Sequence, residues 1–156
     1  MRTKLPTIVF FVLLLAWVFW SQFFWDMPVN SEHSFKHWSP RAQKGEAVAQ
    51  YNLGIMYENG LSYVAQDYKE AARWYLLSAE QGNADAQFVL GDMYAEGRGV
   101  PQDYVRSHMW WSFSAALGDE AATYEKNAQA HKMTSSQIAK AEQLAGRCIQ
   151  QNYKNC

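Results

Sequence analysis

The sequence lacks the motifs that carry most hydrolytic and nucleotide chemistry. It contains no H-E-x-x-H, no G-x-S-x-G, no P-loop and no Ser-x-x-Lys, so it offers no zinc-protease helix, nucleophile turn, phosphate cradle or acylating serine. It also lacks an excess of one charge, with 14 Lys plus Arg against 15 Asp plus Glu. Since nucleic-acid binders need a basic surface, we expect no nucleic-acid partner. We also expect no catalytic residues and no cofactor.

Metal ligands are equally sparse. His33 and His37 have the i, i+4 spacing of two zinc ligands on a helical turn, and Glu32 lies beside them. No firm third ligand accompanies them. We therefore interpret the pair as solvated and expect no metal site.

Charged residues are absent from Leu5 to Trp25, and residues 8–20 are apolar throughout. About 20 helical residues span a bilayer core of about 30 Å, so this stretch is long enough for a transmembrane helix. A cleaved signal peptide would end in small residues with an A-x-A pattern, whereas residues 21–25 read S-Q-F-F-W. We therefore expect residues 1–25 to form an uncleaved anchor, with a cleaved signal as the alternative.

The flanking charges predict the orientation of this anchor. Arg2 and Lys4 precede the apolar stretch and Asp26 follows it, and basic residues favour the cytoplasmic side. We expect a single-pass inner-membrane protein that meets the membrane through residues 5–25. Its N-terminus would be cytoplasmic and its C-terminal domain periplasmic.

Only two cysteines are present, Cys148 and Cys156, and both lie near the C-terminus. An exported location favours a disulfide between them. Along a continuous helix eight residues cover about 12 Å, whereas disulfide-bonded Cα atoms lie within about 7 Å. A disulfide therefore requires the chain to turn back after Cys148, which Asn152 and Asn155 permit. Two free thiols are the alternative.

The rest of the chain repeats itself. Residues 53–60 and 90–97 share the pattern L-G-x-M-Y-x-x-G at an offset of 37 positions, and residues 66–68 and 102–104 share Q-D-Y at an offset of 36. The period is therefore 36, with one residue inserted in the first loop. Each unit contains two patterns of apolar residues at helical spacing. A period of this length predicts stacked αα-hairpins, in which each unit buries its apolar face on the next.

Further residues predict where the second helix of the first unit begins and how closely the two helices of each unit pack. Asp67 precedes an apolar pattern and Glu70 follows three residues later, which predicts an N-cap with a capping box. Gly54 and Gly91 lie within the first helices, where we expect them to permit close approach of the second helix.

A longer pattern carries a resemblance to a known family. Residues 47–60 and 84–97 read A-x-A-Q-[YF]-x-L-G-x-M-Y-x-x-G, and Q-D-Y and W-[YW] follow each. This combination resembles the Sel1-like repeat, a bacterial relative of the tetratricopeptide repeat, over about residues 42–124. The resemblance implies an all-α fold, an αα-hairpin solenoid of two full repeats with degenerate flanking units. The apolar stretch described above adds one transmembrane helix before it.

The expected segments are the anchor at residues 1–25, a linker or half-repeat cap at 26–39, the Sel1-like solenoid at 40–131, and a C-terminal capping helix and tail at 132–156. Pro40 argues against a straight helix over residues 32–44, unless the helix begins with Ser39 as N-cap and Pro40 at its first position. After Gly118 a third unit starts, but Lys126 and Asn127 occupy its Leu-Gly places. We expect that unit to be a degenerate cap.

The resemblance implies an adaptor that holds a protein or peptide in the concave groove of the solenoid, and the expected anchor at residues 1–25 would tether this adaptor to the membrane. Cysteine-rich relatives suggest a β-lactamase-like hydrolase as the alternative, but those relatives carry paired cysteines in every repeat. Candidate partner-binding residues are the first-helix positions that vary between units. They are Asn52, Ile55, Glu58, Val89, Asp92 and Glu96. Because we expect them to lie outside the core, Asp92→Ala should cost less than about 0.5 kcal/mol of stability.

Overall fold

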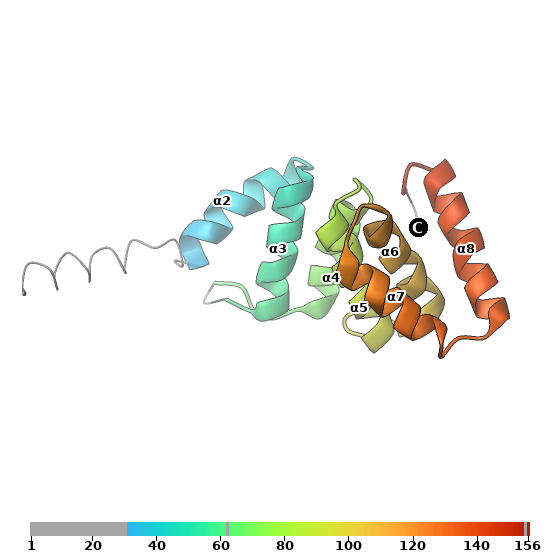
Figure 1. Cartoon of the computed structure of the whole chain (residues 1–156). Helices are drawn as coiled ribbons and strands as arrows, with labels where there is room; N and C mark the ends of the chain where they lie inside the picture. Colours follow the sequence, from blue (N-terminus) through green and yellow to red (C-terminus); the bar gives the residue numbers. More distant parts are fainter. Residues whose placement is uncertain (1–30, 62, 155) are drawn as a thin grey trace, which may run out of the picture.

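The computed structural model describes residues 31–61, 63–154 and 156, which form seven helices in a row (Figure 1). In chain order these are α2 (Ser31–Gln43), α3 (Ala47–Asn59), α4 (Tyr68–Ala79), α5 (Ala84–Glu96), α6 (Tyr104–Ala116), α7 (Glu120–Ala130) and α8 (Ser135–Gln150). The predicted all-α fold is confirmed for this part of the chain.

The predicted membrane anchor, residues 1–25, lies outside the described residues, as does the start of the predicted linker at 26–30. Among the residues that are described, none of the helices combines the length and the apolar character that a membrane span needs.

Two helical hairpins form the middle of the row, because α3 packs on α4 and α5 packs on α6. The hairpins are joined in turn, since α4 also packs on α5 and α6 on α7. At one end α2 packs on α3, and at the other α8 returns to pack on α6 (Figure 1). Each hairpin thus covers the apolar face of the next, as the repeat period predicts.

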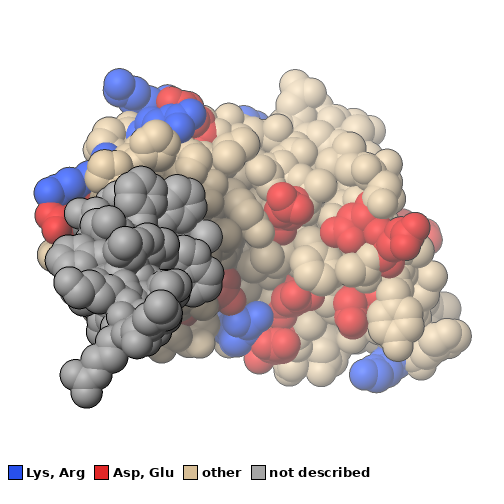
Figure 2. All heavy atoms as spheres, turned by 60° about the vertical axis from the view of Figure 1, so that its left-hand side comes forward, with Lys and Arg blue, Asp and Glu red and all other residues tan. Residues whose placement is uncertain are grey.

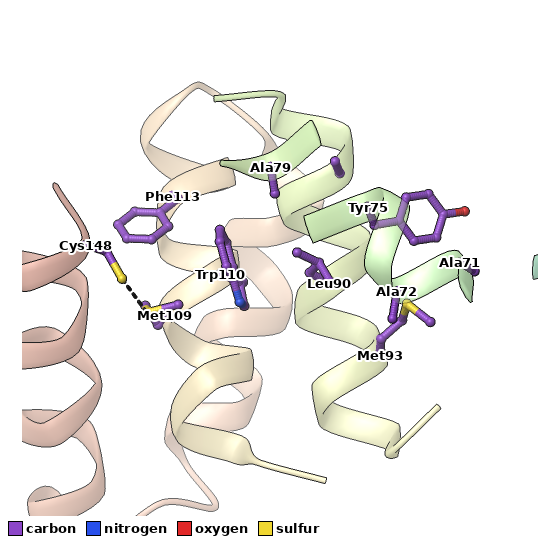
Figure 3. Packing of buried hydrophobic residues seen from close by; sticks show 11 residues of the cluster. Ala71, Ala72, Tyr75, Ala79, Leu90, Met93, Met109, Trp110, Phe113 and Cys148 are labelled. Carbon is purple, nitrogen blue, oxygen red and sulfur yellow. Dashed lines mark hydrogen bonds between the residues drawn. The ribbon is translucent and has the colours of Figure 1, made fainter. Parts of the chain in front are cut away.

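The main apolar cluster lies between α4, α5 and α6 and is shown in Figure 3. Its largest fully buried side chains are Trp110 and Tyr75. The other members shown and labelled there are Ala71, Ala72, Ala79, Leu90, Met93, Met109, Phe113 and Cys148. Small alanines on α4 alternate with these large side chains, which lets the helices pack closely.

Glycine at the two L-G positions is required by the packing of the second helices. A Cβ atom added at Gly54 would lie 2.6 Å from the ring of Tyr75, and one at Gly91 would collide with the indole of Trp111. The prediction that these glycines permit close helix approach is therefore confirmed.

Two repeated polar residues join the helices to one another. Gln50 and Gln87 donate from Nε2 to the backbone carbonyl eight residues earlier, at 3.3 and 3.2 Å, and so attach each hairpin to the helix before it. Ser78 and Ser114 donate from Oγ to the carbonyl of the first residue of α3 and α5, at 2.7 and 3.0 Å. These glutamines and serines, which recur in both repeats, therefore have structural roles.

The N-caps of the second helices are Asp67 and Asp103, whose side chains each accept two backbone N–H groups. Asp67 confirms the predicted cap. Its predicted capping-box partner, Glu70, instead forms an ion pair with Arg73. The longer reach of an i, i+3 guanidinium draws this carboxylate away from the cap.

The helix α2 differs from the expectation based on Pro40. It begins at Ser31 and continues through Pro40 to Gln43, so Ser39 is not its N-cap. Pro40 is exposed, while Phe35 and Trp38 of the same helix pack against the buried residues of α3. This packing offsets the backbone hydrogen bond that proline cannot make. The expected boundary between residues 39 and 40 consequently falls inside a helix.

The C-terminal helix α8 starts with a capping box between Thr134 and Gln137. After it the chain turns back through Asn152 and Tyr153, with φ angles of 51° and 61°. The turn brings Cys156 to Cys148 with a Cα–Cα distance of 5.4 Å and their sulfur atoms at bonding distance. The predicted reversal is confirmed at Asn152, whereas Asn155 lies outside the described residues.

Candidate functional site

Three of the six predicted partner-binding residues are engaged within the repeats. Ile55 and Val89 are half-buried and pack against the main apolar cluster. Asn52 is half-buried, and its Nδ2 donates to the Val48 carbonyl of its own helix at 2.8 Å. Neighbouring hairpins cover one side of each first helix, so the varying positions are less open than their spacing suggests.

Glu58 and Glu96 belong to a network that joins the two repeats. Tyr75 donates its hydroxyl to Glu58 Oε2 at 2.6 Å, and Arg98 Nη1 donates to Glu58 Oε1 at 2.6 Å. Arg98 Nε also pairs with Glu96 Oε2 at 2.5 Å. Burial and the bond to Glu58 raise the pKa of Tyr75 far above its usual value, so it stays a hydroxyl donor. Arg98 therefore ties α3 to the end of α5.

The described part of the chain contains a pocket of about 340 Å³ between α5, α6 and α7. Its lining consists of Phe88, Asp92, Ala95, Glu96, Tyr104, Trp111, Glu125, Gln129 and Lys132. The structure thus brings together two of the predicted residues, Asp92 and Glu96. The others in the lining were not predicted.

Asp92 is held by the second helix of its own hairpin. Trp111 donates from Nε1 to Asp92 Oδ1 at 3.0 Å. Burial raises the pKa of Asp92 to about 6; the Trp111 bond and Arg98 act in the opposite direction, while Glu96 and Glu125 raise it further. Asp92 thus lies outside the buried core, as expected, but its carboxylate is half-buried and hydrogen-bonded.

Two polar side chains of α7 complete the pocket. Glu125 is half-buried at the place that Val89 has one repeat earlier. Gln129 occupies the place of Met93, is 7% exposed, and has a buried Nε2 atom with no hydrogen-bond partner. The signal in the sequence is that polar residues, Glu125 and Gln129, replace the apolar Val89 and Met93 in the third unit.

The pocket carries unpaired negative charge. Within the described residues, no Lys, Arg or His nitrogen lies within 4.0 Å of the carboxylate of Asp92 or Glu125. Lys132 lies at the pocket but is exposed. Figure 2 shows a face of the molecule on which Asp and Glu side chains gather, with few Lys or Arg near them.

Neither histidine of the candidate metal pair has metal-ligand surroundings in the structure. Both are exposed on α2, and His37 Nε2 lies 2.9 Å from Arg41 Nη1. Across the described residues no group of three His, Cys, Asp or Glu side chains could hold a metal ion.

Comparison with known proteins identifies the repeat. Residues 47–83 and 84–119 each match the Sel1 repeat. Among solved structures, a protective antigen of uropathogenic Escherichia coli that displays an SLR fold matches with a TM-score of 0.73 and 30% identity, covering 85% of this chain and 30% of that one. Among curated proteins no match is found.

Two further structures agree. A Sel1 repeat protein from Oxalobacter formigenes matches with a TM-score of 0.56 and 41% identity, over 58% of this chain and 26% of that one. Cysteine rich protein B of Helicobacter pylori matches with a TM-score of 0.57 and 26% identity, over 61% and 71%. The chain thus spans less than a third of the first two structures. The two consecutive hairpins of this chain, over residues 47–119, are therefore Sel1 repeats.

Proposed function

We propose that this chain is a protein-binding module that holds a partner polypeptide against the first helices of its hairpins, α3, α5 and α7. Sel1-like repeats generally mediate protein–protein interactions. The observation that carries the proposal is the pocket between α5, α6 and α7, where aromatic side chains lie beside two carboxylates, Asp92 and Glu125, that form no ion pair within the described residues. Mixed linings of this kind are typical of recognition sites.

The proposal is one of binding without catalysis. The pocket lining holds no Ser, Thr or Cys to act as an acylating nucleophile and no His to serve as its base. The β-lactamase-like alternative therefore draws no support from the pocket. The repeated polar residues Gln50, Gln87, Ser78 and Ser114 form hydrogen bonds that join the helices.

We also propose that the module is tethered to the inner membrane by residues 5–25, with its repeats in the periplasm. Support comes from the uncharged stretch and from Arg2 and Lys4 before it. The closeness of Cys148 and Cys156 suits an oxidising compartment. A tether of this kind would keep the bound partner near the envelope.

Site-specific photo-crosslinking tests the binding proposal. A photoreactive phenylalanine analogue replaces Tyr104, which lines the pocket and is 40% exposed, in the full chain produced in bacterial cells. The matched control carries the same analogue at Ile149, which is 55% exposed on α8 and outside the pocket. We expect a protein adduct of defined mass from position 104 and not from 149. No adduct at 104, or the same adduct at both, would refute the proposal.

A further inference from the structure

We propose that the pocket between α5, α6 and α7 receives a lysine or arginine side chain of the partner polypeptide. The inference rests on the proposed binding function and specifies the chemistry of the partner. In this proposal the carboxylates bind the cationic group and the aromatic and apolar lining packs on its methylene stem. Gln129 donates a hydrogen bond to the adjoining backbone carbonyl of the partner.

The carboxylates provide the charge that a basic side chain would meet. Glu96 is already paired with Arg98, so Asp92 and Glu125 remain without a cation among the described residues. Trp111 fixes the Asp92 carboxylate through Oδ1, and no described residue bonds to its other oxygen. A half-buried carboxylate loses part of its hydration. An ammonium or guanidinium group would replace that hydration with charge-assisted hydrogen bonds.

The remaining lining suits a long aliphatic stem. Phe88, Ala95, Tyr104 and Trp111 supply apolar and aromatic surface beside the carboxylates. Lysine and arginine bury their methylene groups along such surface while the charged end reaches polar groups. Aromatic faces add a cation–π attraction. A volume of about 340 Å³ lies at the lower end of ligand pockets, which favours one side chain over a folded domain.

Gln129 is a second and independent indication of a ligand. Its side chain lines the pocket and is 7% exposed, and its buried Nε2 donor has no hydrogen-bond partner among the described residues. Buried donors without an acceptor are uncommon in folded proteins. A backbone carbonyl next to the bound basic residue would accept this hydrogen bond. The combination of carboxylates and an amide donor therefore fits a polypeptide better than a free amine.

The same arrangement does not occur one repeat earlier. The place of Asp92 is taken there by Ile55, that of Glu125 by Val89 and that of Gln129 by Met93. The equivalent surface between α3 and α5 is thus apolar at these three places, and its carboxylate, Glu58, is already bonded to Tyr75 and Arg98. This difference supplies repeat-matched substitutions, because Gln129→Met installs the side chain that the fold already accepts in an equivalent place.

Substitution of Lys132 should strengthen the binding of a basic peptide, whereas substitution of the carboxylates should weaken it. It is the only basic residue of the pocket lining and is exposed, so it repels an incoming cation without closing the pocket. Lys132→Gln should therefore tighten the binding of such a peptide.

The experiment titrates the full chain, kept in a non-ionic detergent, with the peptide acetyl-Gly-Ser-Lys-Ser-Gly-amide. The matched peptide has norleucine in place of lysine. Binding is followed by the NMR signal of the Trp111 indole N–H, identified as the signal missing from Trp111→Phe. We expect this signal to shift with the lysine peptide and not with the norleucine peptide. Equal shifts with both peptides would overturn the proposal.

Variants locate the binding. Asp92→Asn keeps an acceptor for Trp111 and should weaken binding of the lysine peptide about tenfold or more, since hydrogen bonds to charged groups are strong. Asp85→Asn removes the same charge from an exposed position on the same helix and should change the affinity less than about twofold. Equal affinities of these two variants would refute the role of Asp92.

A free amine distinguishes binding by the carboxylates from binding by Gln129, because it has a cation but no backbone carbonyl. Gln129→Met should weaken the lysine peptide several-fold and leave n-butylammonium unaffected, because only the peptide has a carbonyl for Gln129. If n-butylammonium binds as tightly as the peptide, polypeptide recognition is refuted. The Tyr104 adduct tests the proposed function separately: an adduct that persists undiminished in Asp92→Asn leaves that function standing and overturns the basic-residue pocket.

Discussion

Asp92 allows the strongest test of the site, because its ionisation should oppose folding. Its pKa is about 6 in the folded chain against the usual 3.8. The protonated carboxyl therefore stabilises the fold fully below about pH 3.8, and this stabilisation is lost as the pH rises through about 6. The change Asp92→Asn keeps a neutral acceptor for Trp111 at all pH values. We expect it to stabilise the chain at neutral pH and not in acid.

The size of this gain follows from the same shift. A difference of about two pKa units corresponds to about 3 kcal/mol. The carboxylate is only half-buried, so screening by solvent reduces this figure, and the neutral amide accepts a weaker hydrogen bond from Trp111 than a carboxylate does. We therefore expect Asp92→Asn to raise the free energy of unfolding by about 1 to 2 kcal/mol at pH 7.5.

The assay is denaturant unfolding of the full chain in non-ionic detergent at several pH values between 4 and 8, at constant ionic strength. The difference between Asp92→Asn and the natural chain should shrink toward zero as the pH falls to about 4. Asp85→Asn, on the same helix, controls for the loss of one charge. A difference that does not vary with pH, or a variant less stable than the natural chain at pH 7.5, would refute the reasoning.

Three further predictions concern packing, the tail and the membrane. Gly91→Ala should destabilise the fold by about 1 to 3 kcal/mol through its collision with α6, whereas Gly146→Ala, where a Cβ meets nothing within 4 Å, should stabilise α8 by about 0.5 to 1 kcal/mol; thermal melting compares them, and equal shifts would contradict the packing. Mass spectrometry of exported protein should find Cys148 linked to Cys156, and reduction should lower stability by about 2 to 3 kcal/mol; alkylation of both thiols without reduction would contradict the link. Alkaline washing should leave the full chain in the membrane fraction, and release would contradict an anchor at residues 5–25.

The helices and their joints were predictable because they depend on short-range patterns that occur twice. Asp67 caps α4 by accepting nearby backbone N–H groups, and Gly54 leaves space for the ring of Tyr75. The repeat with a period of 36 shows the corresponding residues a second time. The start of α2 was not predictable from Pro40, since the compensating contacts of Phe35 and Trp38 are made with α3. Tertiary packing of this kind overrides a local preference.

The pocket was only partly predictable, because three helices from two units form it. Spacing placed Asp92 and Glu96 on a first helix but did not reveal that Trp111 would bond to the first and Arg98 to the second. The place of Gln129 in the pocket was not predicted, because a degenerate cap is not expected to line a binding site. Polar residues at apolar places of a repeat are the signal that would have found it.

The position of α6 bears on which part of the protein stays folded during partial opening. The main contacts of α6 are with three helices, α5, α7 and α8, whereas those of α2 are with α3. Local opening in a stacked array is set by such neighbour contacts, so amide hydrogens of α6 should exchange slowest and those of α2 fastest. The pocket is built on α5, α6 and α7 and therefore includes the slowly exchanging α6. The wall of the pocket that α6 provides, with Tyr104 and Trp111, should therefore stay folded while α2 opens and closes.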